Sequence, residues 1–169
     1  MRKITLLVFT IALCLQSYAQ VSVSGTPPSF TQKMSKNIVT YNLPSVDVPK
    51  MLQEDEDEQK LDKSQPMRFG KDFDVHLSLK NTGTWTTLSN GDRVWRLKVA
   101  SKGAKSINFL FGKFHMPQGA EFYIYNEDKT YKIGAFTALN NKPHGEFSTA
   151  PVKGKTVILE YFEPKAVKN

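Results

Sequence analysis

Apolar and polar residues alternate through most of the chain from Phe69 onward, and this period of two is typical of strands with one buried face. In residues 94–99, for example, Trp95, Leu97 and Val99 share one face. About eight strands are expected, at residues 73–79, 85–88, 94–99, 107–111, 121–126, 131–137, 145–149 and 156–162. We predict no helix after residue 19, and the sequence contains no internal repeat. The pattern therefore predicts an all-β chain.

Turn-forming residues separate these apolar runs at intervals of roughly eight to twelve residues. Asn90 and Gly91 are the strongest hairpin signal, because both residue types accept the positive φ of a tight turn. Lys102 with Gly103 and residues 117–119 mark further turns. This punctuation favours an antiparallel β-sandwich or jelly-roll-like domain over residues 66–164.

Residues 1–19 have the layout of a secretory signal peptide. Arg2 and Lys3 form a positive start, residues 4–15 are almost wholly apolar, and Ser17 and Ala19 place small residues before a cleavage point. The apolar run is shorter than the ~20 residues that span a bilayer. We therefore expect cleavage after Ala19, export to the periplasm or the exterior, and no stable membrane anchor.

The single cysteine, Cys14, lies inside this leader. Leu13 before it is too large for the small residue that a lipoprotein signal needs. The exported chain would contain no disulfide and no thiol nucleophile, so its stability rests on a hydrophobic core. About 150 residues are enough for one such core.

Residues 20–65 are predicted to be an extended, acidic lead segment. Pro44 and Pro49 interrupt its apolar runs, and residues 54–58 are five consecutive carboxylates. We interpret this acidic run as a solvated linker. Calcium binding is the alternative, but known calcium loops alternate their ligands around a turn-forming glycine, and no glycine occurs here.

Charge is distributed unevenly along the chain. Residues 20–64 contain five Lys and seven Asp or Glu, a net of −2, whereas residues 65–169 contain sixteen Lys or Arg and nine Asp or Glu, a net of +7. An acidic lead and a basic body indicate attraction within the chain or to a partner. Nucleic acid is not expected as that partner, because the basic residues are scattered singly and form no recognition motif.

Residues 91–161 contain several motifs in a defined order. They read GDRVWRLKVASKGAKSINFLF, FHMPQGAEFYIYN, IGAFTALNNKPHGEFSTAPVKGK and TVILEYFEP. In this order the chain resembles the N-terminal pro-region module of secreted bacterial lysyl-endopeptidase-type, trypsin-like serine proteases. The matching positions are residues 95–96, 101–106, 116–120, 123–125, 134–137, 140–141 and 154–155. Met116 replaces the usual Leu of that family, and Lys155 the usual Asp.

The resemblance implies a non-catalytic pro-region or accessory domain that inhibits a trypsin-like protease domain and assists its folding, in cis or in trans. In the resembled proteins a catalytic domain follows, whereas this sequence ends at Asn169. It is compatible with a fragment and with a stand-alone module. A Lys-specific protease would find Lys165 and Lys168 in the tail of residues 165–169, which makes them candidate processing sites.

No catalytic set is expected in this chain. His76, His115 and His144 occur in separate polar or turn contexts, and the Gly-Asp-Ser-Gly-Gly type of turn that carries the catalytic serine is absent. The histidines also lack the spacing of zinc ligands, so no metal and no cofactor is predicted.

Aromatic side chains offer a second interpretation. Tyr123 and Tyr125 share one strand face and, with Trp85, are candidates for a surface that stacks on sugar rings. Core packing is the competing interpretation, because large aromatics are usually buried at least in part. The alternative function is therefore a module that binds glycan or the cell surface. A purely structural domain of a secreted scaffold also fits the residues.

Overall fold

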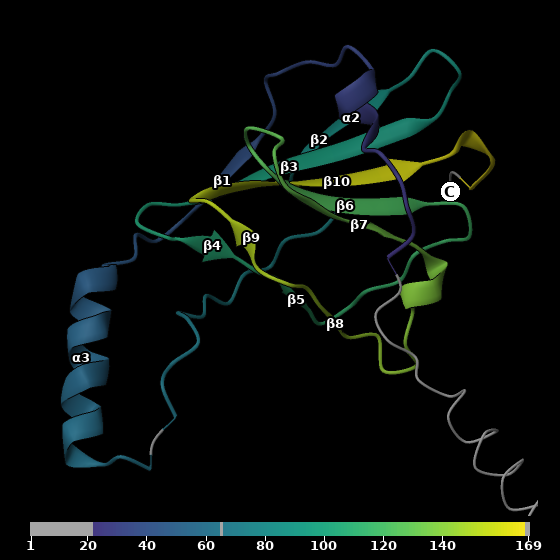
Figure 1. The fold of residues 1–169 in the computed structure, drawn as a ribbon. Helices are drawn as coiled ribbons and strands as arrows, with labels where there is room; N and C mark the ends of the chain where they lie inside the picture. Colours follow the sequence, from purple (N-terminus) through teal and green to yellow (C-terminus); the bar gives the residue numbers. More distant parts are fainter. Residues whose placement is uncertain (1–21, 65, 168–169) are drawn as a thin grey trace, which may run out of the picture.

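One six-stranded sheet organises the protein. The computed structural model describes residues 22–64 and 66–167. The strands follow the order β1 (Thr40–Leu43), β3 (Arg93–Ser101), β10 (Thr156–Glu163), β6 (Glu121–Asn126) and β7 (Lys132–Phe136), and β2 (Thr84–Thr87) also pairs with β3 (Figure 1). All pairings in this main sheet are antiparallel except that of β1 with β3, which is parallel.

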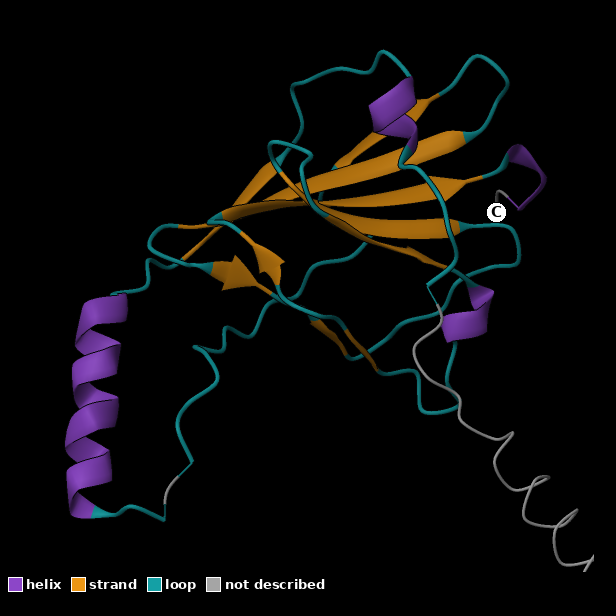
Figure 2. Ribbon diagram, in the orientation of Figure 1, coloured by secondary structure: helices purple, strands orange, loops and turns teal. Residues whose placement is uncertain are grey.

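Two small sheets lie beside the main sheet. They pair β4 (Ser106–Ile107) with β9 (Val152–Lys153), and β5 (Leu110–Phe111) with β8 (Phe147–Ser148). The helical elements are α2 (Pro28–Thr31), α3 (Val48–Leu61), η1 (Ala138–Asn140) and η2 (Lys165–Val167) (Figure 2). The described residues form no closed barrel, and the predicted all-β fold is confirmed.

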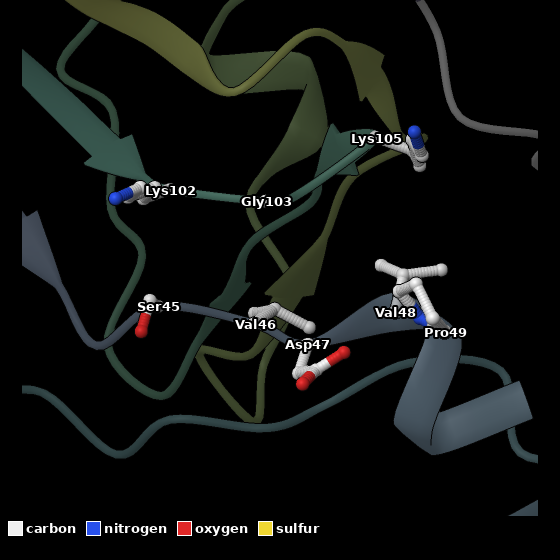
Figure 3. Close-up of a pocket in the computed structure, with 8 residues that line it drawn as sticks. All are labelled: Ser45, Val46, Asp47, Val48, Pro49, Lys102, Gly103 and Lys105. Carbon is white, nitrogen blue, oxygen red and sulfur yellow. The ribbon is translucent and has the colours of Figure 1, made fainter.

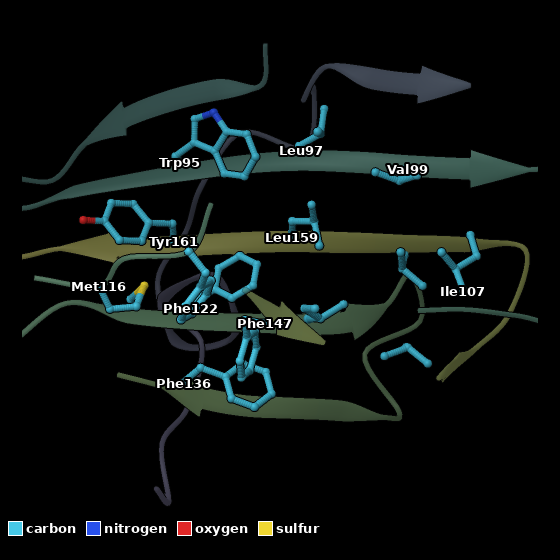
Figure 4. Packing of buried hydrophobic residues seen from close by; sticks show 14 of the residues in the cluster. Trp95, Leu97, Val99, Ile107, Met116, Phe122, Phe136, Phe147, Leu159 and Tyr161 are labelled. Atoms are coloured by element: carbon cyan, nitrogen blue, oxygen red, sulfur yellow. The ribbon is translucent and has the colours of Figure 1, made fainter. Parts of the chain in front are cut away.

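The core fills the space between the main sheet and the small sheets. Leu159 in β10 pairs with Leu97 in β3 and with Ile124 in β6, so three apolar side chains form a row across the sheet. Five phenylalanines pack on one another and extend this core, namely Phe111, Phe114, Phe122, Phe136 and Phe147. Figure 4 shows Phe122, Phe136 and Phe147 among them. The ring of Phe147 stacks on that of Phe114 with centroids 4.3 Å apart. The period of two in the sequence therefore corresponds to the buried face of each strand.

The hairpin predicted at Asn90 and Gly91 is confirmed. Leu88 N donates to Asp92 O at 2.8 Å, and Gly91 N donates to Leu88 O at 2.9 Å. Gly91 has a φ of +90°, which a glycine adopts without steric cost. This loop joins β2 to β3 as an antiparallel pair.

The strand predicted at residues 73–79 does not form, and this expectation was wrong. The neighbouring edge of β3 is already occupied by β2 and β1. The segment instead runs irregularly and is held by Asn81, whose Nδ2 donates to His76 O at 2.8 Å and whose Oδ1 accepts from Ser78 N at 2.8 Å. Alternation alone does not provide a hydrogen-bonding neighbour.

The extended linker predicted within residues 20–65 is wrong over α3, which contains the acidic run. Asp47 caps the helix by accepting from Lys50 N at 3.1 Å, and Pro49 lies in the first turn, where proline is tolerated. Arg68 Nε donates to Asp55 at 2.6 Å, and this contact compensates part of the acidic repulsion. The lead segment also supplies β1, so it is part of the same fold as the sheet.

Within residues 22–64 and 66–167, no helix has the length and apolarity that a bilayer crossing requires. The predicted leader, including its cleavage point at Ala19, lies outside the described residues.

Candidate functional site

The face of the main sheet opposite the core contains charged and aromatic side chains. We call it the outer face and define it by Arg96, Tyr123, Tyr125, Ile158 and Glu160. Glu160 pairs with Arg96 on one side and with Tyr123 on the other, and Ile158 pairs with Tyr125. All five side chains are buried. A sheet face rich in ionisable groups is buried here only because another segment covers it.

That segment is residues 22–35, which we call the strap. The strap crosses the outer face and includes α2 (Figure 1). At its start, Val23 and Ala135 exchange two backbone hydrogen bonds of 3.1 Å at the edge of β7. At its centre, Pro27, Pro28 and Ser29 are buried. The strap therefore covers the outer face from β7 towards β3.

Most polar contacts that hold the strap go to its main chain. Lys132 Nζ donates to Gly25 O at 2.7 Å, and Lys129 Nζ donates to Ser29 O at 2.7 Å. Arg96 Nη2 donates to Ser35 O at 2.9 Å, and the carboxylate of Glu160 accepts from the N–H of Ser29 at 2.9 Å. Three cationic side chains and one carboxylate thus bind peptide groups of the strap.

Glu160 lies at the centre of this arrangement and is fully buried. Its second oxygen accepts a hydrogen bond from Tyr125 Oη at 2.6 Å, and Tyr125 Oη is also 2.8 Å from Ser29 Oγ. Burial, followed by the nearby charge of Glu160, raises the pKa of Tyr125 well above its usual range. Tyr125 is therefore a neutral donor at physiological pH. Tyr123 is similar, because burial and its 2.7 Å bond to Glu121 raise its pKa strongly.

One N–H donor of the Arg96 guanidinium, at Nε, is not used. Only 5% of its surface is exposed, and its Nε has no hydrogen-bond partner in the part of the chain that the structure describes. A buried donor without a partner loses the hydration that it has in water, at a cost of about 1–3 kcal/mol. The strap therefore satisfies the outer face incompletely.

The predicted sugar-stacking surface is not exposed. Tyr123 and Tyr125 are 0% and 1% exposed, because the strap covers them. Trp85 is 38% exposed, but the Arg93 guanidinium lies 4.6 Å from its ring centroid and the Tyr161 ring meets it edge-on at 6.0 Å. The structure therefore does not bring these three aromatics together on an open surface.

The remaining predicted site residues are dispersed. His76, His115 and His144 are all exposed, and His144 Nδ1 accepts from Glu146 N at 3.1 Å. Residues 22–64 and 66–167 contain no cluster of His, Cys, Asp and Glu able to bind a metal ion. Lys165 is exposed at the start of η2, and its N–H donates to Asp92 at 2.8 Å. Lys168 lies outside the described residues.

A shallow depression of about 410 Å³ lies where the lead segment meets the body (Figure 3). Its lining residues are Ser45, Val46, Asp47, Val48, Pro49, Lys102, Gly103 and Lys105. Val46 N donates to Lys102 O at 2.8 Å, and a Cβ on Gly103 would lie 2.0 Å from Val46 O. We interpret this region as the joint that positions α3.

Beyond this joint, α3 projects away from the sheets (Figure 1). Arg68 braces it through Glu54 and Asp55, at 3.1 and 2.6 Å. Leu52 and Leu61 are 51% and 89% exposed. The helix therefore presents carboxylates and apolar side chains to solvent.

No family model matches the chain, and no solved structure matches it. The functional residues that sequence reasoning missed are Ser29, Arg96, Lys129, Lys132 and Glu160. One signal was available: Glu160 interrupts an otherwise apolar run in residues 157–162, where the alternation places it on the same face as Ile158. A buried strand with one carboxylate indicates a hydrogen-bonding partner on that face.

Proposed function

We propose that this chain is a non-catalytic pro-region or accessory domain of a secreted trypsin-like serine endopeptidase precursor. It would bind the protease domain, keep it inactive and assist its folding. Binding to one state of a partner stabilises that state, which is how one module serves both roles. The proposal also includes export through the predicted leader.

The observation that carries the proposal is that the motifs of the resemblance contact one another. In the motif at residues 116–120, Met116 N donates to Asn141 Oδ1 at 2.8 Å, and Asn141 Nδ2 donates back to Met116 O at 2.9 Å. Thr137 N donates to Asn140 Oδ1 at 2.9 Å, which joins the motif at residues 134–137 to the paired asparagines. The motifs at residues 116–120 and 140–141, separated in sequence, thus contact each other directly, and this arrangement supports the proposal.

The projecting helix α3 is the part of the chain that we propose contacts the protease. It carries the acidic run, stands apart from the basic body and exposes Leu52 and Leu61. Apolar side chains ringed by charge are typical of interaction surfaces. Because α3 projects from the sheets, binding of the protease to this helix would not require the main sheet to rearrange.

An inhibition titration tests the proposal. Residues 20–169 are titrated against a trypsin-like, Lys-specific protease from the same secretome, with activity followed on a small substrate and chain integrity followed by mass spectrometry. We expect saturable inhibition at stoichiometric concentration, without cleavage. Absence of both inhibition and complex formation would overturn the proposed role.

A pair of variants tests the contact surface. Glu56→Gln combined with Glu58→Gln removes two exposed charges from α3, and we expect about tenfold weaker inhibition at low salt. The matched control is Glu146→Gln, an exposed carboxylate in another loop, which should leave inhibition unchanged. Equal inhibition by all three proteins would place the contact elsewhere on the chain.

A further inference from the structure

We propose that the outer face is a peptide-binding groove, and that the strap occupies it as an exchangeable internal ligand. The groove would take a proline-containing segment of another polypeptide that forms a helical turn where the strap forms α2, a second copy of this chain included. This inference does not depend on the protease role.

The groove recognises its occupant mainly through the main chain. Lys132, Lys129 and Arg96 donate to three strap carbonyls spaced along residues 25–35, and Glu160 accepts from a strap N–H. The edge of β7 adds two backbone bonds at Val23. Main-chain contacts of this kind are available to other chains that pair with the edge of β7 and then form a helical turn at the position of α2.

At the centre of the strap, side-chain contacts restrict which residue types the groove accepts. Pro27, Pro28 and Ser29 are buried, and the ring of Phe30 meets Tyr125 edge-on with centroids 4.9 Å apart. Lys129 Nζ lies 4.8 Å from the Phe30 ring centroid. The groove therefore favours a Pro-Pro-Ser-aromatic order, and proline at the start of the helical turn lowers the entropy that the ligand loses on binding.

The groove requires an occupant, and the strap is an imperfect one. Without a segment over it, the carboxylate of Glu160 would lose the N–H of Ser29. Even with the strap in place, Arg96 Nε is buried and unpaired in the described chain. An occupant that places an acceptor at Arg96 Nε would satisfy the outer face more fully than the strap does.

The strap can leave without dismantling the main sheet. Pairing of β1 with β3 begins at Thr40, beyond the end of the strap. In the connector, Lys36 and Asn37 are exposed, whereas Ile38 packs on the outer face and Val39 hydrogen-bonds to Thr84 Oγ1 and Lys98 N. A segment joined to the fold through exposed residues such as Lys36 and Asn37 opens at lower free energy than the core.

Peptide binding to the full exported chain tests this proposal. The probe is a fluorescein-labelled synthetic peptide with the sequence of residues 22–35, and its binding to residues 20–169 is followed by anisotropy. In the wild-type chain the strap competes with the probe. Ser29→Pro removes the N–H that binds Glu160, and we expect it to raise probe affinity by about tenfold or more.

Modified probes test main-chain recognition directly. N-methylation at the position of Ser29 removes the same N–H from the probe, and its affinity should fall by about tenfold or more. Alanine at the position of Thr26, which is exposed in the strap, should change little. Equal binding of the N-methylated and unmodified probes would overturn the recognition mechanism.

Hydrogen exchange of residues 22–35 reports strap release independently of the probe. Faster exchange in Ser29→Pro without saturable probe binding would overturn the proposal. Unchanged exchange in Ser29→Pro and in the double variant with Phe30→Ala would also overturn it, since the strap would then be a fixed part of the fold. Concentration-dependent dimers of the loosened variant would support exchange between copies.

Discussion

Tyr125 and Glu160 form a buried 2.6 Å hydrogen bond on the outer face of the main sheet, from Tyr125 Oη to Glu160 Oε2. This bond connects strand β6 to strand β10, and through Ser29 it also holds the strap. Because both side chains are almost fully buried, water cannot replace either partner.

Replacing Tyr125 with Phe should therefore destabilise the protein. The change removes the donor to Glu160 and leaves a buried carboxylate oxygen without it. We expect the free energy of unfolding to fall by about 1–3 kcal/mol in urea denaturation. Tyr131→Phe, at a site 45% exposed, is the control and should change it by less than about 0.5 kcal/mol. Equal effects would show that the buried bond contributes nothing.

Stability should also fall at alkaline pH. Burial, followed by the charge of Glu163, raises the pKa of Tyr161 to about 12. An unfolded tyrosine loses its proton near pH 10, so above that pH the unfolded state binds fewer protons than the native state. The stabilisation is complete below about pH 10 and is lost as the pH rises towards 12, with a slope of up to about 1.4 kcal/mol per pH unit.

Urea denaturation between pH 9 and pH 12 measures this slope. Tyr161→Phe should make the fall shallower than in the wild-type protein. Tyr123 and Tyr125, whose pKa values are also raised by burial, contribute in the same direction. Identical slopes for wild type and Tyr161→Phe would contradict the assignment.

The aromatic core should be sensitive to truncation at Phe147. Its ring stacks on Phe114 at 4.3 Å and meets Phe136 at 4.9 Å. Phe147→Ala removes these contacts and leaves a cavity, at an expected cost of about 3–5 kcal/mol. Leu139→Ala, at a site 67% exposed, should cost far less. A midpoint of unfolding that is the same for both variants would refute this role of the ring.

Gly103 should not tolerate a side chain. Its φ is +90°, and a Cβ would lie 2.0 Å from Val46 O, so Gly103→Ala must displace the segment that leads into α3. We expect a loss of roughly 1–3 kcal/mol in the free energy of unfolding. Gly112→Ala is the control, since a Cβ there would meet no atom within 4 Å beyond its chain neighbours and no positive φ is required. A neutral Gly103→Ala would exclude this joint as a constraint.

The projecting helix should depend on its cap. Asp47→Ala removes the acceptor for Lys50 N and should cost α3 about 1 kcal/mol. Amide exchange in the first turn of α3 should become several-fold faster, while exchange in β6 stays the same. Asp72→Ala, at an exposed loop position, should leave the helix unaffected. Uniform exchange in all three proteins would show that the cap is dispensable.

Sequence reasoning succeeded where local pattern and burial coincide. The predicted strand at residues 121–126 is β6, and the one at residues 156–162 ends one residue before β10 does. Both strands are buried on both faces, and their apolar runs, rich in aromatic and β-branched residues, are typical of such strands. The hairpin between β2 and β3 was predictable because Gly91 marks a positive φ locally.

Predictions from the sequence failed where contacts between residues far apart in sequence determine the structure. Ser29 binds Glu160 across 131 positions of sequence and Tyr125 across 96, and neither contact has a local signature. The helix α3 was missed although Asp47 as its cap and Pro49 in its first turn are local signals, because the five carboxylates were interpreted as a solvated linker. The alternation of residues 73–79 indicated a strand, yet this segment pairs with no strand of the described sheets.

The sequence by itself determined the all-β class, the main strands and the turns between them, because side-chain periodicity and glycine conformations are local properties. Only the tertiary structure decided that the lead segment joins the fold and that Tyr123 and Tyr125 are covered rather than exposed. The covering of the two tyrosines depends on the strap, which provides the N–H of Ser29 to the buried carboxylate of Glu160. A sheet has two faces, and the pattern that defines one face does not show what covers the other.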